Sequence, residues 1–293
     1  MRIEALLPAA LILAFPSFSA LAANKEKQPA AERAYVETSY LLAPRKVGEF
    51  TLDGVHYDGA RKYAGADFRY IVEGHQEIRV DVYVYPAGRM DSSTAMTKGM
   101  EAFRADMKLA VDAKAYSDLS LNDEQDFLLT EPNQPAINEH AEDANTAALL
   151  QALAGANQTG GRKLLMTMNL QPQDWPMYSG GYLFYKQLYF FKVRASAAQE
   201  RVSTEEFETL ADRAARALVP AIEVANVGGC ANSTITVDSD ASPEEMAKAL
   251  VTQAVVHGGY NCYATEDDAE IKRKSQDAEL VNIAYEPKEW TSE

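Results

Sequence analysis

The sequence predicts an α+β fold: an antiparallel sheet packed by helices, with a small disulfide-tied β-α-α-β unit at the C-terminus. Three observations support this prediction. Apolar and polar residues alternate in short runs such as 77–85, as in half-buried strands. Apolar residues recur at spacings of three and four in 91–116, as in a helix that buries one face. The only two cysteines, Cys230 and Cys262, flank a predicted helix near the C-terminus.

Residues 1–23 have the features of a secretory signal peptide. Arg2 supplies a positive charge, 6–15 form a short apolar core, and Ala20-Leu21-Ala22 provides the small residues that precede cleavage. The apolar run is shorter than the about 17–25 residues that a membrane-spanning helix needs. We therefore expect a periplasmic or secreted protein, with residues 24–34 as a flexible leader.

The first predicted strands cover residues 47–52, 67–73 and 77–85. Residues 74–76 fit a hairpin turn, which makes His75 a solvated residue at the loop tip. Tyr83 and Tyr85 alternate with the valines of their strand and point away from the apolar face. We take them as candidate ligand- or partner-binding residues, because an exposed ring offers apolar area with a polar tip. Cross-strand packing is the alternative.

The next elements are two predicted helices. The methionine-rich stripe of 91–116 indicates a helix packed on the sheet, and a partner-binding groove is the alternative. Residues near 136–161 are acidic at the start and end in glycine, which predicts a helical insertion.

The predicted main domain covers residues 35–221, and its last part is expected to return to the sheet. Residues 163–170 form a strand, 175–181 a turn-rich connection, and 182–195 a single central strand. Lys186, Lys192 and Arg194 share one parity in that apolar strand, so one of its faces should be partly exposed to water. Ser203 begins a capping box for a helix at 204–219, which Pro220 is expected to stop.

Residues 222–293 are predicted to form the small C-terminal unit. It contains a strand at 234–237, a helix that starts after Ser242, a short charged helix at 267–274 and a strand at 280–285. An even number of cysteines in an exported chain predicts a disulfide between Cys230 and Cys262. A reactive thiol near His257 is the alternative.

Composition limits the classes of partner. The net charge of −15 disfavours binding to nucleic acid and to anionic lipid surfaces, which both need clustered Lys and Arg. Solubility explains this charge, and a basic partner or a cationic ligand is the alternative. The 47% hydrophobic content is typical of a folded core.

No catalytic, metal-binding or nucleotide-binding motif stands out. The sequence contains no Gly-x-Ser-x-Gly, His-Glu-x-x-His, P-loop or Gly-x-Gly-x-x-Gly element, and its four histidines lie far apart. We therefore expect no cofactor and a non-enzymatic binding or accessory protein, with an envelope protein or a small ligand as partner. The alternatives are a hydrolase assembled from dispersed carboxylates and histidines, and a structural component of the cell envelope.

Two resemblances agree with this expectation. Residues 44–88, followed much later by 182–218, resemble the PsbP-like α/β/α sandwich group over about half of the chain. The strand end Tyr83-Val84-Tyr85 is similar to one in a set of uncharacterised exported bacterial proteins. The first resemblance implies an accessory or binding role, and neither supplies a catalytic residue.

Overall fold

The structure is a computed structural model that describes residues 33–129, 160–232, 242, 246 and 258–290. The chain from Arg33 onward forms one unit. The predicted signal peptide, residues 24–32 of the leader, residues 136–159 of the helical insertion, the strand at 234–237 and most of the helix after Ser242 lie outside the described residues.

The larger sheet has nine strands, and its paired strands are antiparallel. In spatial order they are β2 (Lys46–Val47), β3 (Phe50–Tyr57), β4 (Ala66–Val72), β5 (His75–Pro86), β10 (Tyr189–Ala198), β9 (Trp175–Lys186), β8 (Gly160–Leu170) and β6 (Tyr116–Leu121), with β7 (Gln125–Leu128) also on β8. A short 3-10 helix, η1 (Gly59–Ala64), joins β3 to β4. The predicted α+β class and antiparallel sheet are confirmed.

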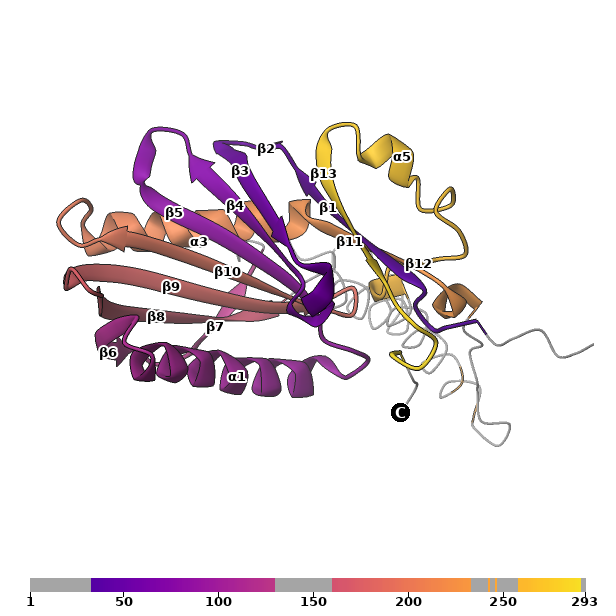
Figure 1. Cartoon of the computed structure of the whole chain (residues 1–293), viewed down its shortest axis with the longest axis horizontal. Helices are drawn as coiled ribbons and strands as arrows, with labels where there is room; N and C mark the ends of the chain where they lie inside the picture. The colour runs from indigo at the N-terminus through magenta and orange to yellow at the C-terminus, as the bar shows by residue number, and fades with distance from the viewer. Residues whose placement is uncertain (1–32, 130–159, 233–241, 243–245, 247–257, 291–293) are drawn as a thin grey trace, which may run out of the picture. The chain divides into compact units, whose positions relative to one another are not determined.

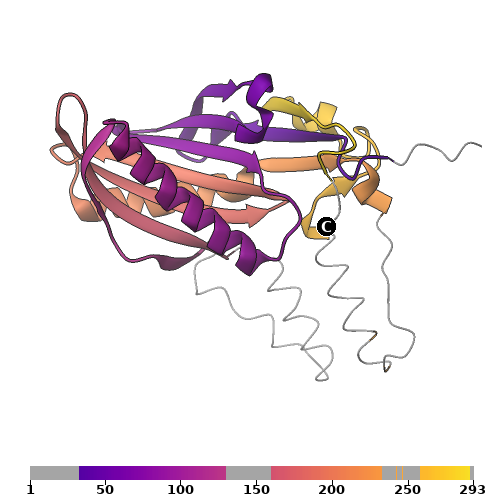
Figure 2. The ribbon, with the colours of Figure 1, turned by 60° about the horizontal axis from the view of Figure 1, so that its bottom comes forward.

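Helices α1 (Ser92–Asp112) and α3 (Thr204–Ala221) lie on opposite faces of this sheet (Figures 1 and 2). Helix α3 packs on β5, β9 and β10, where the alternating Val80, Val82 and Val84 are fully buried beneath it. Helix α1 buries its predicted stripe, including Met100 and Phe103, against β8 and β9. Helix α1 covers only part of this second face, and the rest stays open.

The start of α3 is as predicted, and the ends of both helices differ from the prediction. The Asp91 side chain caps α1 by accepting from the N–H of Thr94, and Ser203 caps α3. Helix α1 ends at Asp112 instead of reaching Tyr116, because Lys114 adopts a φ of 57° and the chain turns into β6. Helix α3 includes Pro220, which lies in the last turn, where only one backbone donor is lost.

The stretch 175–195 is a hairpin, so two predictions there are wrong. The expected single strand at 182–195 breaks at Gln187 and Leu188, whose φ angles of 54° and 68° form a two-residue turn between β9 and β10. The expected turn at 175–181 is the first half of β9. Its Gly181 lies against α1, where a Cβ atom would stand 2.2 Å from the ring of Phe103. This glycine therefore serves close packing and not a turn.

The smaller sheet combines both ends of the described chain. Its strand order is β12 (Cys262–Tyr263), β11 (Glu223–Val227), β1 (Thr38–Pro44) and β13 (Ala278–Ala284). Strand β1 is antiparallel to both of its neighbours, and β12 is parallel to β11. The sheet of the predicted C-terminal unit is thus completed by a strand from the start of the main domain. Helix α5 (Ile271–Lys274) packs on this sheet.

The predicted disulfide is confirmed. Cys230 lies in η3 (Gly229–Asn232), Cys262 begins β12, and their Cα atoms are 5.8 Å apart. Cys230 is buried in the main core, so the bond ties the smaller sheet to the centre of the protein. In the described part of the chain, no helix is both long enough and apolar enough to span a membrane.

Candidate functional site: a groove on the open face of the sheet

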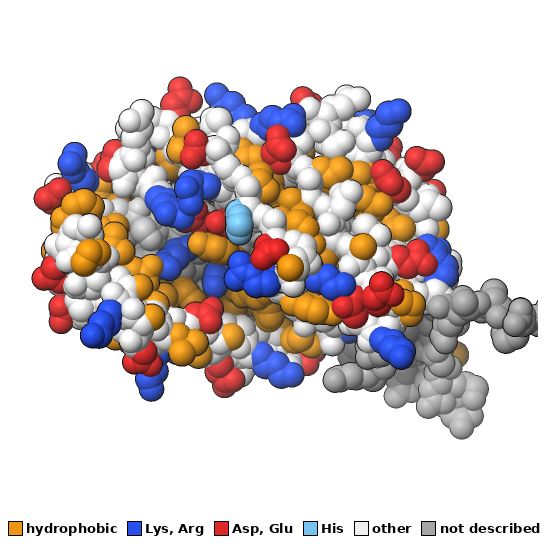
Figure 3. All heavy atoms as spheres, in the orientation of Figure 1, with side chains coloured by type: hydrophobic (Ala, Val, Ile, Leu, Met, Phe, Trp, Pro, Cys, Tyr) orange, Lys and Arg blue, Asp and Glu red, His pale blue; other side chains and the backbone are white. Residues whose placement is uncertain are grey.

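A groove of about 280 Å³ lies on the face of the larger sheet that α1 leaves open. We call it the sheet-face groove. It is lined by Glu77, Arg79, Asp81, Tyr83, Tyr116, Met168, Leu170, Met177, Ser179, Arg194 and Ser196. Figure 3 shows this side of the molecule hollowed beside α1, with basic and hydrophobic side chains gathered along the hollow.

The antiparallel register places a row of charged residues across this face. Arg69 on β4 lies opposite Asp81 on β5, which lies opposite Arg194 on β10. In the next row, Tyr83 on β5 lies opposite Asp67 on β4 and opposite Lys192 on β10. Side chains of one row share a face of the sheet, so residues far apart in sequence meet here.

Asp81 is the anionic centre of the first row. Its side chain is almost fully buried, and both oxygens accept from guanidinium groups: Arg69 Nε at 3.0 Å and Arg79 Nε at 2.5 Å. Two charge-assisted partners offset the cost of burying the carboxylate. The charge of Asp81 is therefore already occupied by this pair of arginines.

Arg194 has a different environment. Its Nη2 donates to the hydroxyl of Tyr116 at 3.0 Å, and its Nε donates to Ser179 Oγ at 3.3 Å. The guanidinium carbon lies 5.2 Å from the centre of the Tyr116 ring. Among the described residues, no carboxylate lies within 4.0 Å of this guanidinium. A half-buried cation that lines a groove with only neutral partners is suited to receive an anion.

The two predicted site residues surround Lys192. The Lys192 ammonium lies 5.2 Å from the ring centre of Tyr83 and 5.7 Å from that of Tyr85. Tyr83 lines the sheet-face groove, and burial raises its pKa to about 12, so it stays a neutral phenol. Tyr85 packs with Phe190 beside α1 and does not line the groove. Both rings were expected to be exposed, but both are half-buried, and only Tyr83 lines the groove.

Asp67 adds a second carboxyl group beside Tyr83. Burial, and next the negative charge of Asp81, raise its pKa to about 6. Its Oδ1 atom is buried and has no hydrogen-bond partner among the described residues. This carboxyl therefore changes its charge near pH 6, which can link the charge of this face to acidity.

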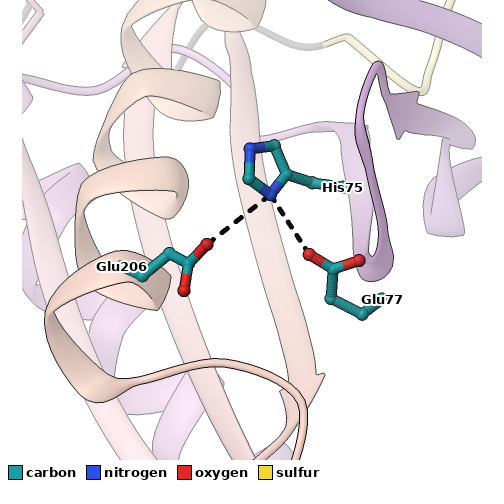
Figure 4. A group of neighbouring side chains, drawn as sticks. All are labelled: His75, Glu77 and Glu206. Atoms are coloured by element: carbon teal, nitrogen blue, oxygen red, sulfur yellow. Dashed lines mark hydrogen bonds and ion pairs between the residues drawn. The ribbon is translucent and has the colours of Figure 1, made fainter.

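A second cluster lies at one end of the sheet, where the β4–β5 hairpin approaches the start of α3 (Figure 4). His75 Nδ1 lies 3.1 Å from Glu77 Oε1 and 3.8 Å from Glu206 Oε1. His75 is the first residue of β5, and its side chain is 30% exposed. It is thus held between two carboxylates instead of being a solvated loop tip, because α3 brings Glu206 to it. Of the described residues, this is the group that could hold a metal ion.

The sequence contained part of the signal for the groove. Of the three residues with shared parity, Lys192 and Arg194 lie on this partly wet face as predicted. Lys186 does not, because the turn at Gln187 and Leu188 reverses the strand and its ammonium donates to the carbonyls of Val219 and Ile222 at the end of α3. The partners of Arg194 come from β6 and β9, and no local pattern connects Tyr116 or Ser179 to it. Comparison with protein-family models and with curated proteins found no match to this chain.

Proposed function

We propose that this protein is an exported, non-enzymatic binding protein that holds a small organic anion in the sheet-face groove. The observation that carries this proposal is the environment of Arg194, whose charge has no carboxylate partner among the described residues. The anionic group of the ligand would pair with the guanidinium, which prefers planar carboxylates or phosphates.

The rest of the groove supports an apolar body for this ligand. Met168, Leu170 and Met177 line it together with the faces of Tyr83 and Tyr116. Methionine and tyrosine side chains adapt to flat or irregular apolar groups. The volume of about 280 Å³ lies just below the range of about 300–1,000 Å³ that is typical of sites for drug-sized ligands. A compact acid fits better than an extended one.

Location outside the cytoplasm agrees with the disulfide. We place the protein more narrowly in the periplasm or the secreted fraction, after cleavage of the signal peptide behind Ala22 or Ala23. N-terminal sequencing of the protein from its producing cell should then start at Ala23 or Asn24. An intact Met1 in the cytoplasmic fraction would contradict export.

Calorimetric titration with a panel of small carboxylates, phosphates and sulfonates tests the binding function. We expect Arg194→Gln to weaken the best ligand of the panel about 10-fold or more, because a hydrogen bond to a charged group contributes about 1.5–3 kcal/mol. Arg194→Lys should keep part of the affinity. Arg273→Gln, on exposed α5 and outside the groove, is the matched control and should bind as the wild type does.

Two results would overturn this function. One is that the wild-type protein binds no member of the panel, and the other is that Arg194→Gln binds as tightly as the wild type. Turnover of ester, peptide or glycoside substrates that is lost on a single carboxylate change would favour the hydrolase instead.

A further inference from the structure

The cluster of His75, Glu77 and Glu206 joins residues from two elements at the end of the sheet. His75 and Glu77 are two residues apart at the start of β5, so their side chains leave the strand on the same side. Glu206 comes from the first turn of α3. Figure 4 shows the two carboxylates approaching the same ring nitrogen, Nδ1, from different directions.

The spacing of the three ligand atoms is close to that of a metal site. Bonds of about 2.0–2.2 Å to a tetrahedral Zn²⁺ put the ligand atoms about 3.3–3.6 Å apart. Here Nδ1 lies 3.1 Å from one carboxylate oxygen and 3.8 Å from the other, and all three atoms lie within 4.8 Å of one another.

The donor types and the charge also fit a divalent cation. One imidazole nitrogen with two carboxylate oxygens is a ligand set used by zinc. The two glutamates carry two negative charges, which match the ion and outweigh the positive end of the α3 dipole. No described residue hydrogen-bonds Nε2 of His75, so this nitrogen can carry the ring proton and leave the Nδ1 lone pair for the metal.

The cluster opens onto a hollow, so a fourth ligand has room. A cavity of about 350 Å³ is lined by His75 and Glu206, together with Ser203, Glu205, Thr209 and Arg213 among others. A zinc ion held by three protein groups keeps a fourth position for water or for another molecule. This hollow provides that position on the solvent side of the cluster.

We propose that His75, Glu77 and Glu206 bind one divalent transition-metal ion, with Zn²⁺ as the best match. Glu77 also lines the sheet-face groove, but no hydrogen bond or ion pair among the described residues joins the three ligands to Arg194. The metal proposal therefore does not depend on the anion-binding function. Without an ion, the same geometry is explained by a hydrogen bond that the protonated Nδ1 of His75 donates to Glu77. The two explanations differ in whether the protein takes up metal at this place.

Calorimetric titration of the chelator-treated full chain with Zn²⁺ distinguishes them. We expect one ion to bind per chain at this site, and His75→Ala and Glu206→Gln each to weaken that step 10-fold or more. Glu205→Gln is the matched control: it lies in the same helical turn and lines the same hollow, but it is not a ligand. Its affinity should stay within about twofold of the wild type. The same holds for His56→Ala, which changes an exposed histidine of β3.

Thermal unfolding gives a second measurement. Zn²⁺ should raise the unfolding temperature of the wild type and of Glu205→Gln, but not that of Glu206→Gln, because only the folded site binds the ion. Glu206 is half-exposed, so its variant can be studied even if His75→Ala does not fold. The proposal is wrong if the wild type binds no Zn²⁺, or if Glu206→Gln binds it as tightly as Glu205→Gln does.

Discussion

Gly181 shows how one residue without a side chain fixes the position of α1. A Cβ atom there would lie 2.2 Å from the Phe103 ring, whereas at Gly180 the nearest atoms, from Leu165 and Tyr182, would be 3.3 Å away. We expect Gly181→Ala to lower the free energy of unfolding by about 1–3 kcal/mol through overpacking. Gly180→Ala, which makes the same backbone change one residue earlier, should cost less. Denaturant titration compares the two, and equal losses would contradict the close packing of α1.

Asp67 should make stability depend on pH. Its pKa is raised from 3.8 to about 6 in the folded protein, so the folded state holds the proton more tightly than the unfolded chain does. The resulting stabilisation is complete below about pH 4 and is lost as pH rises through 6. At about 1.36 kcal/mol per pKa unit, the change is at most about 3 kcal/mol.

The variant Asp67→Asn tests this dependence. It cannot ionise, so its stability relative to the wild type should increase between pH 4.5 and pH 7.5. Asp53→Asn, on an exposed position of the neighbouring strand β3, is the control and should show no such increase. Parallel stability curves for the wild type and Asp67→Asn across this range would rule out the raised pKa.

Among the elements, β11, β12 and η3 depend most on the disulfide. By the chain-entropy relation, a bond that closes a loop of this length contributes about 3–4 kcal/mol, and the two cysteines are separated by 32 residues. We expect the double variant Cys230→Ser and Cys262→Ser to lose stability of this order. Hydrogen exchange should increase first in β11 and β12, while β5 and β10 keep their protection. Uniform loss of protection over both sheets would show that the bond supports the whole protein equally.

The sequence predicted elements well where one local pattern decided them. Strands β4 and β5 and helices α1 and α3 follow from alternation, helical spacing and capping residues. The β9–β10 turn was missed because Gln187 and Leu188 are not typical residues for positive φ. The groove could be predicted only in part, because the row from Arg69 to Arg194 depends on pairing between distant strands. Glu206 reaches His75 only after α3 has packed on the sheet.

At the scale of the whole molecule, the C-terminal region depends on β1. This strand hydrogen-bonds to β11 on one side and to β13 on the other, and Leu42 lies in the hydrophobic cluster that α5 covers. Without β1, two strands would lose their shared neighbour. We therefore expect residues 222–293 alone to lack cooperative unfolding, even with the disulfide formed.

Fusion of residues 33–44 to that fragment through a flexible linker is the direct comparison. The fusion should improve the dispersion of amide proton signals in NMR spectra, because the central strand is restored. A scrambled version of the same segment is the control. A fragment of residues 222–293 that is well dispersed by itself would show that β1 is not required.

The central position of β1 also matters while the ribosome is still synthesising the chain. This strand is made first among the described strands, and β13, which pairs along its whole length, is made last. Until residue 284 has left the ribosome, β1 has at least one edge with free backbone donors and acceptors. A chain that stops before residue 278 keeps that edge permanently, and open strand edges pair readily with other chains. Truncated products of this protein should therefore associate with one another, whereas a chain that includes residues 278–284 covers the edge with β13.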